Sequence, residues 1–524
     1  MAHELLLHGG SVRVPLAGGR VHEALLIRDG RIVAIGSEGE VARQAGLEAE
    51  RLALEGGCVL PAFADAHVHL SSLGALLGEV NLREAGSLAQ ALALIAEGAR
   101  ELRPGEFLRG RGWDRNHWSD GQPTKEALDR IVAENPVALS SHDGHSIWVN
   151  SAALRLAGIA GDTKNPPGGT IWRDVDGEPT GILSDAASGL VRSLIPERSD
   201  PEVKEALKAG AEHVLQSGVA ALRNCESLRV YRLLLDLVAA DEMSIAIACS
   251  IRPDDIEEAT DLLAHQSVGD RIFIENVKVF VDGALGSQTA LMLEPYEDPS
   301  LGVGLEVTPP ELLREQVAAA AEVGLPVAVH AIGDRGVRQA LDGIERAGRR
   351  DLRPSTSSGR GEPVEPRNSI EHAQLVHPDD LPRFARLGVT ASVQPSHLLT
   401  DIPICERHWG ERSRYAFPIG SLIHSGARVI FGSDCPVEPI DPRRSLYAAT
   451  VRKTLARYPQ GGWYPEESVS MSRALACHTK PVEVGAPADL VVLGRDPLAE
   501  PADQILDNAI SITIVGGEIA YRAE

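Results

Sequence analysis

Short apolar runs, each about the length of a β-strand, recur along the middle of the chain between segments of helical composition. The intervening segments, such as 310–322 and 334–349, are rich in Ala, Leu, Glu and Arg. Eight rounds of strand–helix alternation predict an α/β fold, a parallel (β/α)₈ barrel of the TIM type. The predicted barrel strands are Val59–His69, Gly218–Cys225, Met243–Ile251, Ile274–Asp282, Leu325–Ala331, Asn368–Ala373, Val389–Pro395 and Ala427–Asp434.

The two ends of the chain follow a different pattern, in which apolar and polar residues alternate around glycine turns. Neither end alone has enough strands for a stable sheet. We therefore expect one small composite β-sandwich domain from residues 1–58 and 480–524, with the barrel, residues 59–479, inserted between them. The alternating segments are Glu4–Val14, His22–Ile35, Ala488–Leu493 and Ile510–Tyr521, the last interrupted by the hairpin signal Gly516-Gly517.

Two stretches of the barrel region need separate interpretation. Residues 72–205 form an insertion after strand 1 that is far longer than a crossover helix requires. It follows the carboxyl end of a strand, where barrel active sites lie, and is predicted to be a cap over the pocket. Leu352–Arg367 is rich in Pro, Ser and Gly and is predicted to be a loose loop on the opposite face, with no catalytic role.

The charge and cysteine content of the chain limit the kinds of molecule that it is expected to bind and the compartment in which it is expected to lie. The formal net charge of the 524 residues is −23, which argues against nucleic acid and anionic membranes because both attract basic surfaces. The N-terminus shows no secretory signal, and the apolar runs are too short to span a membrane. The six cysteines are scattered without a CxxC pair, as expected of reduced thiols in a cytoplasmic protein.

Candidate metal ligands stand at the carboxyl ends of several predicted strands. His67 and His69 are two residues apart on strand 1, so both imidazoles can face the barrel axis. His330, His372 and Asp434 end strands 5, 6 and 8. Each alone has a structural explanation, such as a helix cap for Asp434. Because strand ends of a barrel converge on one small area, the five together predict a metal site.

Lys278 lies inside the apolar strand Asn276–Asp282, where an unpaired ammonium group is costly. One interpretation is a salt bridge, to Asp282 or to another barrel carboxylate. The other is chemical: a neutral lysine amine adds carbon dioxide and becomes a carbamate, an anion with two oxygens that can bridge two cations.

The ordered set His67/His69, Lys278, His330, His372 and Asp434, flanked by a two-part β-domain, resembles the amidohydrolase superfamily. Several phrases of the sequence are similar to its amidohydrolase family 3, the branch that resembles N-substituted formamide deformylase. They are Gly112-Trp113-Asp114, Asp143-Gly144-His145, Val277–Gly283, His330–Asp334 and Gln394–His397. The resemblance covers almost the whole chain, apart from the loop at 352–367.

The resemblance implies a metal-dependent hydrolase of non-peptide C–N bonds. His67, His69 and Asp434 would hold the more buried ion, and His330 and His372 the second. Lys278, carbamylated, would bridge the two, with Zn²⁺ as the expected metal in one or both sites. Asp434 would move the proton from water to the leaving nitrogen, and His397 would bind the carbonyl. The weaker substrate-contact candidates are Trp113, Asp114, His145 and Asp282, and a cap core explains the aromatic residue equally well.

Three alternatives stay open. A mononuclear deaminase of an amino-substituted ring needs no lysine on strand 4, so one metal per chain with an unmodified Lys278 favours it. A non-catalytic regulatory barrel would show no turnover despite full metal loading. An ordinary barrel with solvated histidines leaves the six strand-end coincidences unexplained. The expected substrate is a small-molecule amide, by family analogy alone, and a homodimer is the expected assembly.

Overall fold

The computed structural model describes residues 3–14, 20–83, 85–100, 102–114, 118–141, 146–265, 271–347 and 367–523. Except for Arg367, the stretch predicted to be a loose loop lies outside these residues, and so does His145. By its internal contacts the chain divides into two compact units. The first comprises Met1–Ser71 and Ala211–Glu524, and the second Ser72–Gly210.

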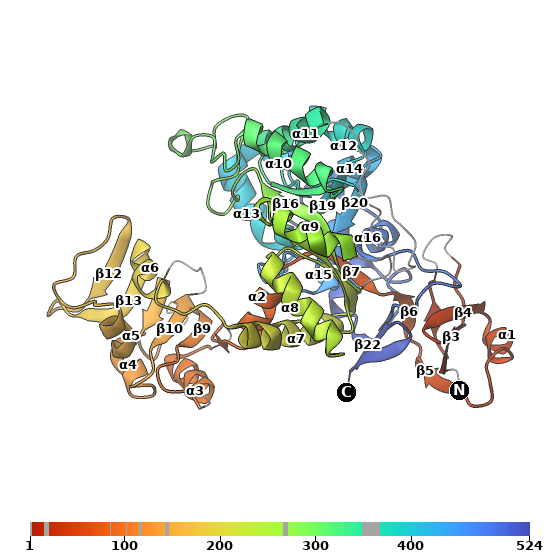
Figure 1. The fold of residues 1–524 in the computed structure, drawn as a ribbon, viewed down its shortest axis with the longest axis horizontal. Helices are drawn as coiled ribbons and strands as arrows, with labels where there is room; N and C mark the ends of the chain where they lie inside the picture. The colour runs from red at the N-terminus through yellow and green to blue at the C-terminus, as the bar shows by residue number, and fades with distance from the viewer. Residues whose placement is uncertain are drawn as a thin grey trace. The chain divides into compact units, whose positions relative to one another are not determined.

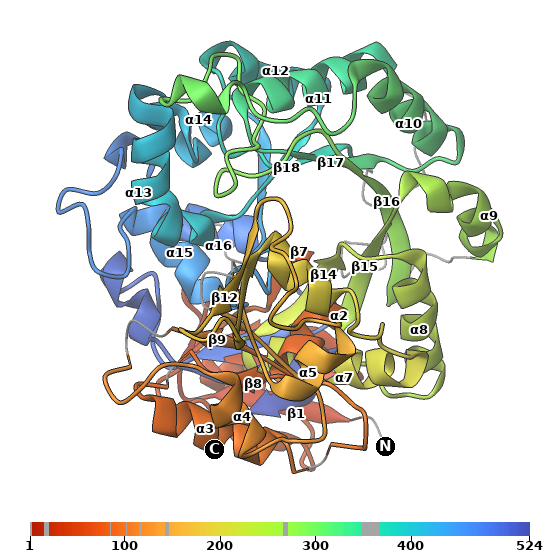
Figure 2. The same cartoon turned by 90° about the vertical axis from the view of Figure 1, so that its left-hand side faces the viewer.

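The first unit contains the predicted barrel. Eight strands form one parallel sheet in the order of the chain, and Figure 2 shows helices α8 to α15 in an outer ring around them. The strands are β7 (Phe63–Val68), β14 (Val219–Asn224), β15 (Ala246–Ile251), β16 (Ile272–Phe280), β17 (Val327–Ala331), β18 (Ser369–His372), β19 (Thr390–Val393) and β20 (Arg428–Phe431). The helices are α8 (Leu228–Ala239), α9 (Ile256–His265), α10 (Pro310–Glu322), α11 (Asp334–Ala347), α12 (Leu381–Leu387), α13 (Leu398–Trp409), α14 (Ile419–His424), α15 (Pro442–Val451) and α16 (Met471–His478).

The barrel closes just beyond the last strand. The Asp434 N–H donates to the His67 carbonyl at 2.8 Å, and the His69 N–H donates to the Cys435 carbonyl at the same distance. Gly432 permits this approach, because a Cβ there would lie 2.7 Å from the His67 nitrogen. The first and last strands therefore meet at the level of the candidate ligands.

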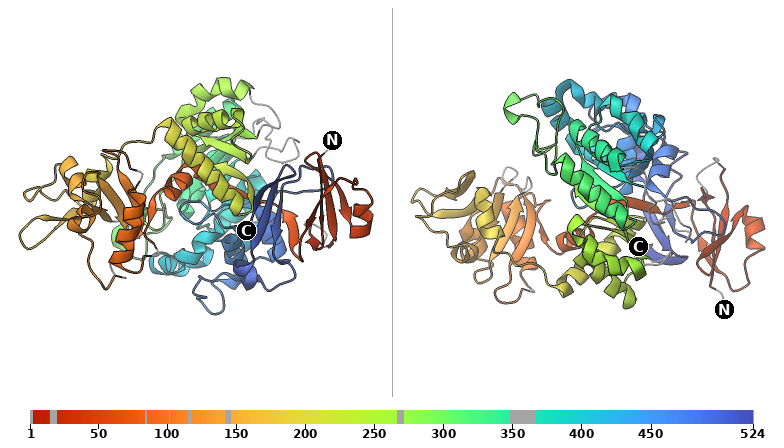
Figure 3. Two further views of the ribbon diagram at one scale, coloured as in Figure 1. Left: turned by 90° about the horizontal axis from the view of Figure 1, so that it is seen from below. Right: turned by 45° about the horizontal axis from the view of Figure 1, so that its top comes forward.

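The expected β-sandwich is present, built from both ends of the chain. One sheet has the order β4-β3-β1-β5 and the other β2-β6-β21-β22-β23. Leu7 of the first sheet and Val492 and Ile514 of the second belong to one buried cluster. In Figure 3 the red N-terminal and blue C-terminal strands lie side by side. The strands are β1 (Glu4–His8), β2 (Ser11–Val12), β3 (Ala24–Arg28), β4 (Arg31–Gly36), β5 (Glu50–Ala53), β6 (Cys58–Pro61), β21 (Leu490–Leu493), β22 (Ile510–Val515) and β23 (Glu518–Arg522).

Two details of the prediction for this region were wrong. The run Val59–His69 is two strands, because β6 pairs with β21 in the sandwich and only β7 belongs to the barrel. The N-terminal segments also form a four-stranded sheet by themselves, with β5 added parallel to β1. Only the second sheet requires both ends of the chain.

The second unit is an independent α/β layer with its own core, drawn in orange and yellow in Figure 1. Its sheet has the order β12-β13-β11-β10-β9-β8, and its role as a cap stays a prediction. The strands are β8 (Val80–Asn81), β9 (Leu108–Trp113), β10 (Val137–Ser141), β11 (Ser146–Val149), β12 (Gly169–Arg173) and β13 (Pro179–Asp185), and the helices include α3 (Leu88–Gly98), α4 (Lys125–Asp129), α5 (Ser151–Leu156) and α6 (Gly189–Arg192). Within the described residues, no helix is long and apolar enough to cross a bilayer.

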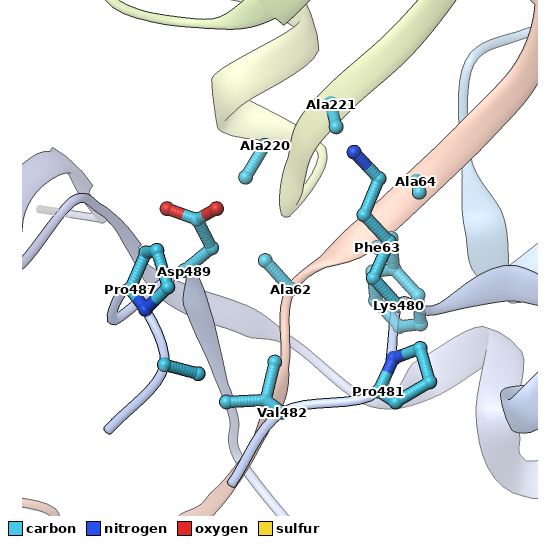
Figure 4. A pocket seen from close by; sticks show the side chains of 11 residues that line it. Ala62, Phe63, Ala64, Ala220, Ala221, Lys480, Pro481, Val482, Pro487 and Asp489 are labelled. Atoms are coloured by element: carbon cyan, nitrogen blue, oxygen red, sulfur yellow. The ribbon is translucent and has the colours of Figure 1, made fainter. Parts of the chain in front are cut away.

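A pocket lies at the end of the barrel opposite the candidate ligands. Its lining includes Phe63 at the start of β7 and Ala220 and Ala221 of β14. Figure 4 shows Lys480 and Asp489 projecting into it from the segment that leads back to the sandwich. The active sites of such barrels lie at the carboxyl ends of the strands. This pocket lies at the amino ends, where residues contribute to stability and not to catalysis.

Candidate metal centre

Three of the predicted ligands come together at the junction of β7 and β20. One ligand atom each from His67, His69 and Asp434 lies within 4.8 Å of the other two. The Nε2 atoms of His67 and His69 are 3.6 and 3.3 Å from Asp434 Oδ1. Asp65 lies two residues before His67 on β7. It accepts hydrogen bonds from the N–H groups of His67 and Ser433 and so fixes the two strand ends to each other.

Asp434 is ionised at neutral pH. Burial by itself raises the pKa of this carboxyl, but the charge of His67 and the hydrogen bond from His69 outweigh it and hold the pKa well below its usual range. The backbone is left-handed at both Asp434 and His372, with φ of 59° and 73°. Such strain in non-glycine residues costs about 1–3 kcal/mol each and concentrates at functional sites.

The second pair, His330 and His372, lies beside the first three ligands. The ring centroids of His330 and His372 are 4.5 Å apart, and those of His372 and His67 are 5.1 Å apart. His330 Nε2 donates to the Gly283 carbonyl at 2.9 Å, which leaves Nδ1 with its lone pair. Burial, with the Lys278 charge, lowers the pKa of His330 to about 3, and burial lowers that of His372 too. Both rings are neutral and able to bind a metal.

This pKa gives a testable dependence of stability on pH in metal-free protein. His330 stays unprotonated in the folded chain, whereas the unfolded chain takes up a proton below about pH 6.5. The folded state therefore loses about 2 kcal/mol from this group between about pH 6.5 and about pH 5. Chemical denaturation of chelator-treated wild type and His330→Gln checks this, because glutamine cannot titrate. Parallel pH slopes for the two proteins would contradict it.

Lys278 faces the same area from β16 and is 5% exposed. Its Nζ has no hydrogen-bond partner among the described residues, and it lies 5.2 Å from the centroid of the Phe280 ring. The predicted salt bridge to Asp282 is not formed. Asp282 instead accepts the N–H groups of Leu291, Ile332 and Gly333, at 2.8–3.0 Å. The Lys278 charge lies close enough to Glu371 to help lower the pKa of that carboxyl, but no hydrogen bond to a carboxylate is formed among the described residues.

Two further predicted site residues, His397 and Asp282, lie in the barrel near the candidate ligands. His397 belongs to the centre, since its Nε2 is 3.7 Å from Asp434 Oδ2 and is buried without a partner among the described residues. Asp282 is 2% exposed, accepts backbone N–H groups of two loops and lies 3.7 Å from His330 Nε2, so the structure gives it a positioning role, and its role in binding substrate stays a prediction.

Trp113 and Asp114 lie at the end of β9 in the second unit. Trp113 is 3% exposed, and its indole N–H donates to the Leu139 carbonyl within that unit's core. The core interpretation therefore explains Trp113 fully. Asp114 is half-buried, and its role stays a prediction, as does that of His145.

A buried carboxylate that the sequence analysis did not assign supports His67. Glu371, on β18, is fully buried and its Oε2 lies 2.8 Å from His67 Nδ1. Ser369 and Arg223 donate to its other oxygen at 2.6 and 3.2 Å. Burial raises the pKa of Glu371, but the His67 hydrogen bond and the Arg223 charge hold it below the ordinary value. The carboxylate therefore accepts a hydrogen bond from the Nδ1–H group and leaves Nε2 of His67 available for a metal.

We expect Glu371→Gln to weaken zinc binding about 10- to 100-fold, because a neutral amide supports the imidazole less than a carboxylate does. Zinc affinity measured by competition with a chromophoric chelator checks this. Ser369→Ala is the matched control, since it removes one hydrogen bond to Glu371 and leaves the contact with His67. Equal zinc affinity in Glu371→Gln and Ser369→Ala would refute the role.

Cys225 is the second residue that the analysis missed. It directly follows β14, and its Sγ accepts a hydrogen bond from the Ser250 hydroxyl at 3.9 Å. Burial raises the pKa of this thiol, but His67 and Lys278 lower it to about 7 overall. The signal was available, because Cys225 ends a predicted strand just as His330 and Asp434 do.

The side chains present fit divalent metal ions. Two neutral imidazoles, a close His-His-Asp group and a buried amine without a partner surround one area at the carboxyl ends of the strands. Nitrogen and oxygen donors of this kind suit zinc and other divalent first-row metals. The barrel and this donor set form a candidate centre for divalent metal ions.

Comparison with known proteins identifies the family. The family model described as "Amidohydrolase family" matches residues 51–521, and the chain belongs to this family. YtcJ of Bacillus subtilis (strain 168), a provisionally assigned amidohydrolase, is 31% identical over 98% of this chain and 99% of its own. The N-substituted formamide deformylase of Arthrobacter pascens is 28% identical over 99% and 98%. The crystal structure of an uncharacterized metal-dependent hydrolase from Pyrococcus furiosus has a TM-score of 0.76 at 28% identity, covering 94% of this chain and 100% of that one.

Proposed function

We propose that the chain is a metal-dependent amidohydrolase that uses water to cleave the C–N bond of a small non-peptide amide, such as an N-formyl or N-acyl amine. The observation that carries this proposal is the buried Lys278 amine, without a hydrogen-bond partner among the described residues, beside the group His67, His69 and Asp434. A mononuclear deaminase has no use for an amine there. The similarity to N-substituted formamide deformylase supports the choice of substrate class.

His67, His69 and Asp434 would hold one zinc ion, and His330 and His372 a second. The Lys278 amine would add to the carbon of carbon dioxide and lose a proton, and the resulting carbamate would supply oxygen ligands for metal. Bound ions of this kind lower the pKa of water from about 15.7 to about 7 and polarise a carbonyl.

The protein's own groups would manage the proton and the carbonyl. Asp434, ionised and next to the imidazoles, would accept the proton of the attacking water and return it to the leaving nitrogen. His397, whose Nε2 is buried beside Asp434, would hydrogen-bond to the carbonyl oxygen and stabilise the charge that develops there.

The test is metal analysis with a substrate panel. Protein prepared with zinc and bicarbonate is assayed against N-formyl amines, N-acyl amines, cyclic amides, carbamates, esters and amino-substituted rings. We expect about two metals per chain, hydrolysis of formyl or acyl amines, and loss of activity on chelation that zinc restores. Ring deamination with one metal per chain would replace this proposal with the deaminase. No turnover at full metal loading would favour a regulatory barrel.

A further inference from the structure

An aromatic side chain is exposed at the end of β16. Phe280 is the last residue of this strand and follows Lys278 by two positions, so both side chains point to the same side of the sheet. Phe280 is 44% exposed, whereas the other residues of β16 are buried or half-buried. Leaving an apolar ring in water costs free energy, so its exposed surface favours contact with another apolar group.

The Phe280 ring lies next to the candidate metal ligands. Its centroid is 5.3 Å from that of the His330 ring and 5.2 Å from the Lys278 Nζ. Phe280 and His330 are also partners in the parallel pairing of β16 with β17. The exposed aromatic surface therefore borders the place where the proposed function puts the second metal.

Hydrogen bonds on both sides of Phe280 hold its backbone in place. The Phe280 carbonyl accepts the Thr308 hydroxyl at 2.6 Å, and the Val281 N–H donates to the His330 carbonyl at 3.0 Å. Small-molecule sites combine apolar and aromatic surface with a few polar groups, and they bind most precisely on rigid elements. An exposed ring at a fixed strand end beside the candidate ligands meets both conditions.

A second exposed apolar residue lies on the other side of the barrel. Val437 is 66% exposed, and its N–H donates to the Asp434 carbonyl at 2.9 Å. It follows β20, and three strands separate β20 from β16 in each direction around the barrel. The candidate ligands therefore have exposed apolar residues near them on two opposite sides, which favours an apolar substrate.

We propose that Phe280 is a substrate-binding residue that selects amides with a bulky apolar group attached to the reacting carbonyl or nitrogen. This inference rests on the proposed function, which brings the reacting amide to the ligands His330 and His372. An apolar group on that amide lies against the Phe280 ring, and both surfaces leave water. The ring contributes binding free energy and takes no part in breaking the bond.

The first test compares the full zinc-loaded chain and its variants on amides that differ in one group, cyclohexyl against methyl. One pair carries the group on nitrogen and the other on the carbonyl carbon, which shows the side of the amide that meets the ring. We expect Phe280→Ala to raise KM about 10-fold for the cyclohexyl member of one pair, with kcat and the methyl member little changed. Phe280→Leu should keep part of the preference, because leucine is also apolar.

Leu312→Ala is the matched control. Leu312 is 43% exposed, as Phe280 is to a similar degree, but it lies on α10 in the outer ring of helices. Its truncation should leave both substrate pairs at wild-type values. Metal analysis of every variant checks that the zinc content equals that of wild type.

A binding measurement gives a readout without turnover. Acetohydroxamate and cyclohexanecarbohydroxamate present the same zinc-binding group with a small and a large apolar substituent. Calorimetry on the zinc-loaded wild type is expected to show tighter binding of the cyclohexyl compound, and the ratio of the two Kd values should shrink about 10-fold in Phe280→Ala. Equal Kd values in wild type would overturn the inference. So would an equal change for both compounds in Phe280→Ala, or a loss of zinc from it, because the ring would then support the protein and not the substrate.

Failure of this inference and failure of the proposed function give different results. A hydroxamate preference that depends on Phe280, in a protein without amide hydrolysis, supports the binding residue and removes the function. Amide hydrolysis with the same substrate preference in wild type and Phe280→Ala supports the function and removes the binding residue.

Discussion

Asp434→Asn is expected to lower kcat by about 10²- to 10⁴-fold, the contribution of a positioned general acid or base. Asparagine keeps the shape of aspartate but has no negative charge to accept the proton from water. The charge is available in the folded protein, because His67 and His69 hold the pKa of Asp434 well below its ordinary value against the opposing effect of burial. Steady-state kinetics on the best amide of the panel checks this.

The same variant removes a ligand oxygen, so metal content must be measured alongside. At zinc concentrations that restore full loading, kcat should stay low while KM changes little, because the lost step is proton transfer and not binding. Asp261→Asn, an exposed residue on α9, is the control and should be indistinguishable from wild type. Near-normal turnover in fully loaded Asp434→Asn would remove Asp434 from the proton transfer.

The barrel could be predicted from the sequence because each strand is a local apolar run and each helix a local periodic one. The carboxyl ends of parallel strands converge, so a residue type and a strand end were enough to bring His67, His330, His372 and Asp434 to one place. The prediction depended on the fold and not on side-chain detail. His330 and His372 are uncharged because burial in the folded barrel lowers their pKa values, and this could not be predicted from the sequence.

What could not be predicted depends on distant pairing. Residues 59–64 are continuously apolar and lead straight into the rest of the strand. Only the pairing with β21, more than 400 residues away in the chain, shows that the first part belongs to the sandwich; Leu490 pairs with Pro61 there. In the sequence, Glu371 is a single charged residue within a predicted strand. Its partner Arg223 lies 148 positions away, so nothing near Glu371 in the sequence indicates the pairing. Cys225 was missed for another reason, since the cysteines were judged by spacing and not by strand position.

Lys278→Met is expected to reduce activity by about 100-fold or more, because the bridge between two ions supports several kcal/mol of charge stabilisation at the reacting bond. Metal content should fall from about two per chain, since His330 and His372 alone offer the second ion only two protein ligands. Added acetate should restore part of the activity by supplying a carboxylate of similar shape to the carbamate. Metal analysis and kinetics with and without acetate check both expectations.

Lys278→Arg separates the carbamate from a simple cation. Arginine keeps the positive charge but does not add carbon dioxide, so it should be as inactive as methionine if the bridge is a carbamate, and active if Lys278 acts as a cation. Stability gives an independent readout, because the Nζ of Lys278 has no partner to lose among the described residues. Without metal, Lys278→Met should be at least as stable as wild type, since an unpaired buried ammonium is replaced by an apolar chain. A strongly destabilised Lys278→Met would show that the amine stabilises the fold, and it would contradict the proposal that Lys278 serves to form a carbamate.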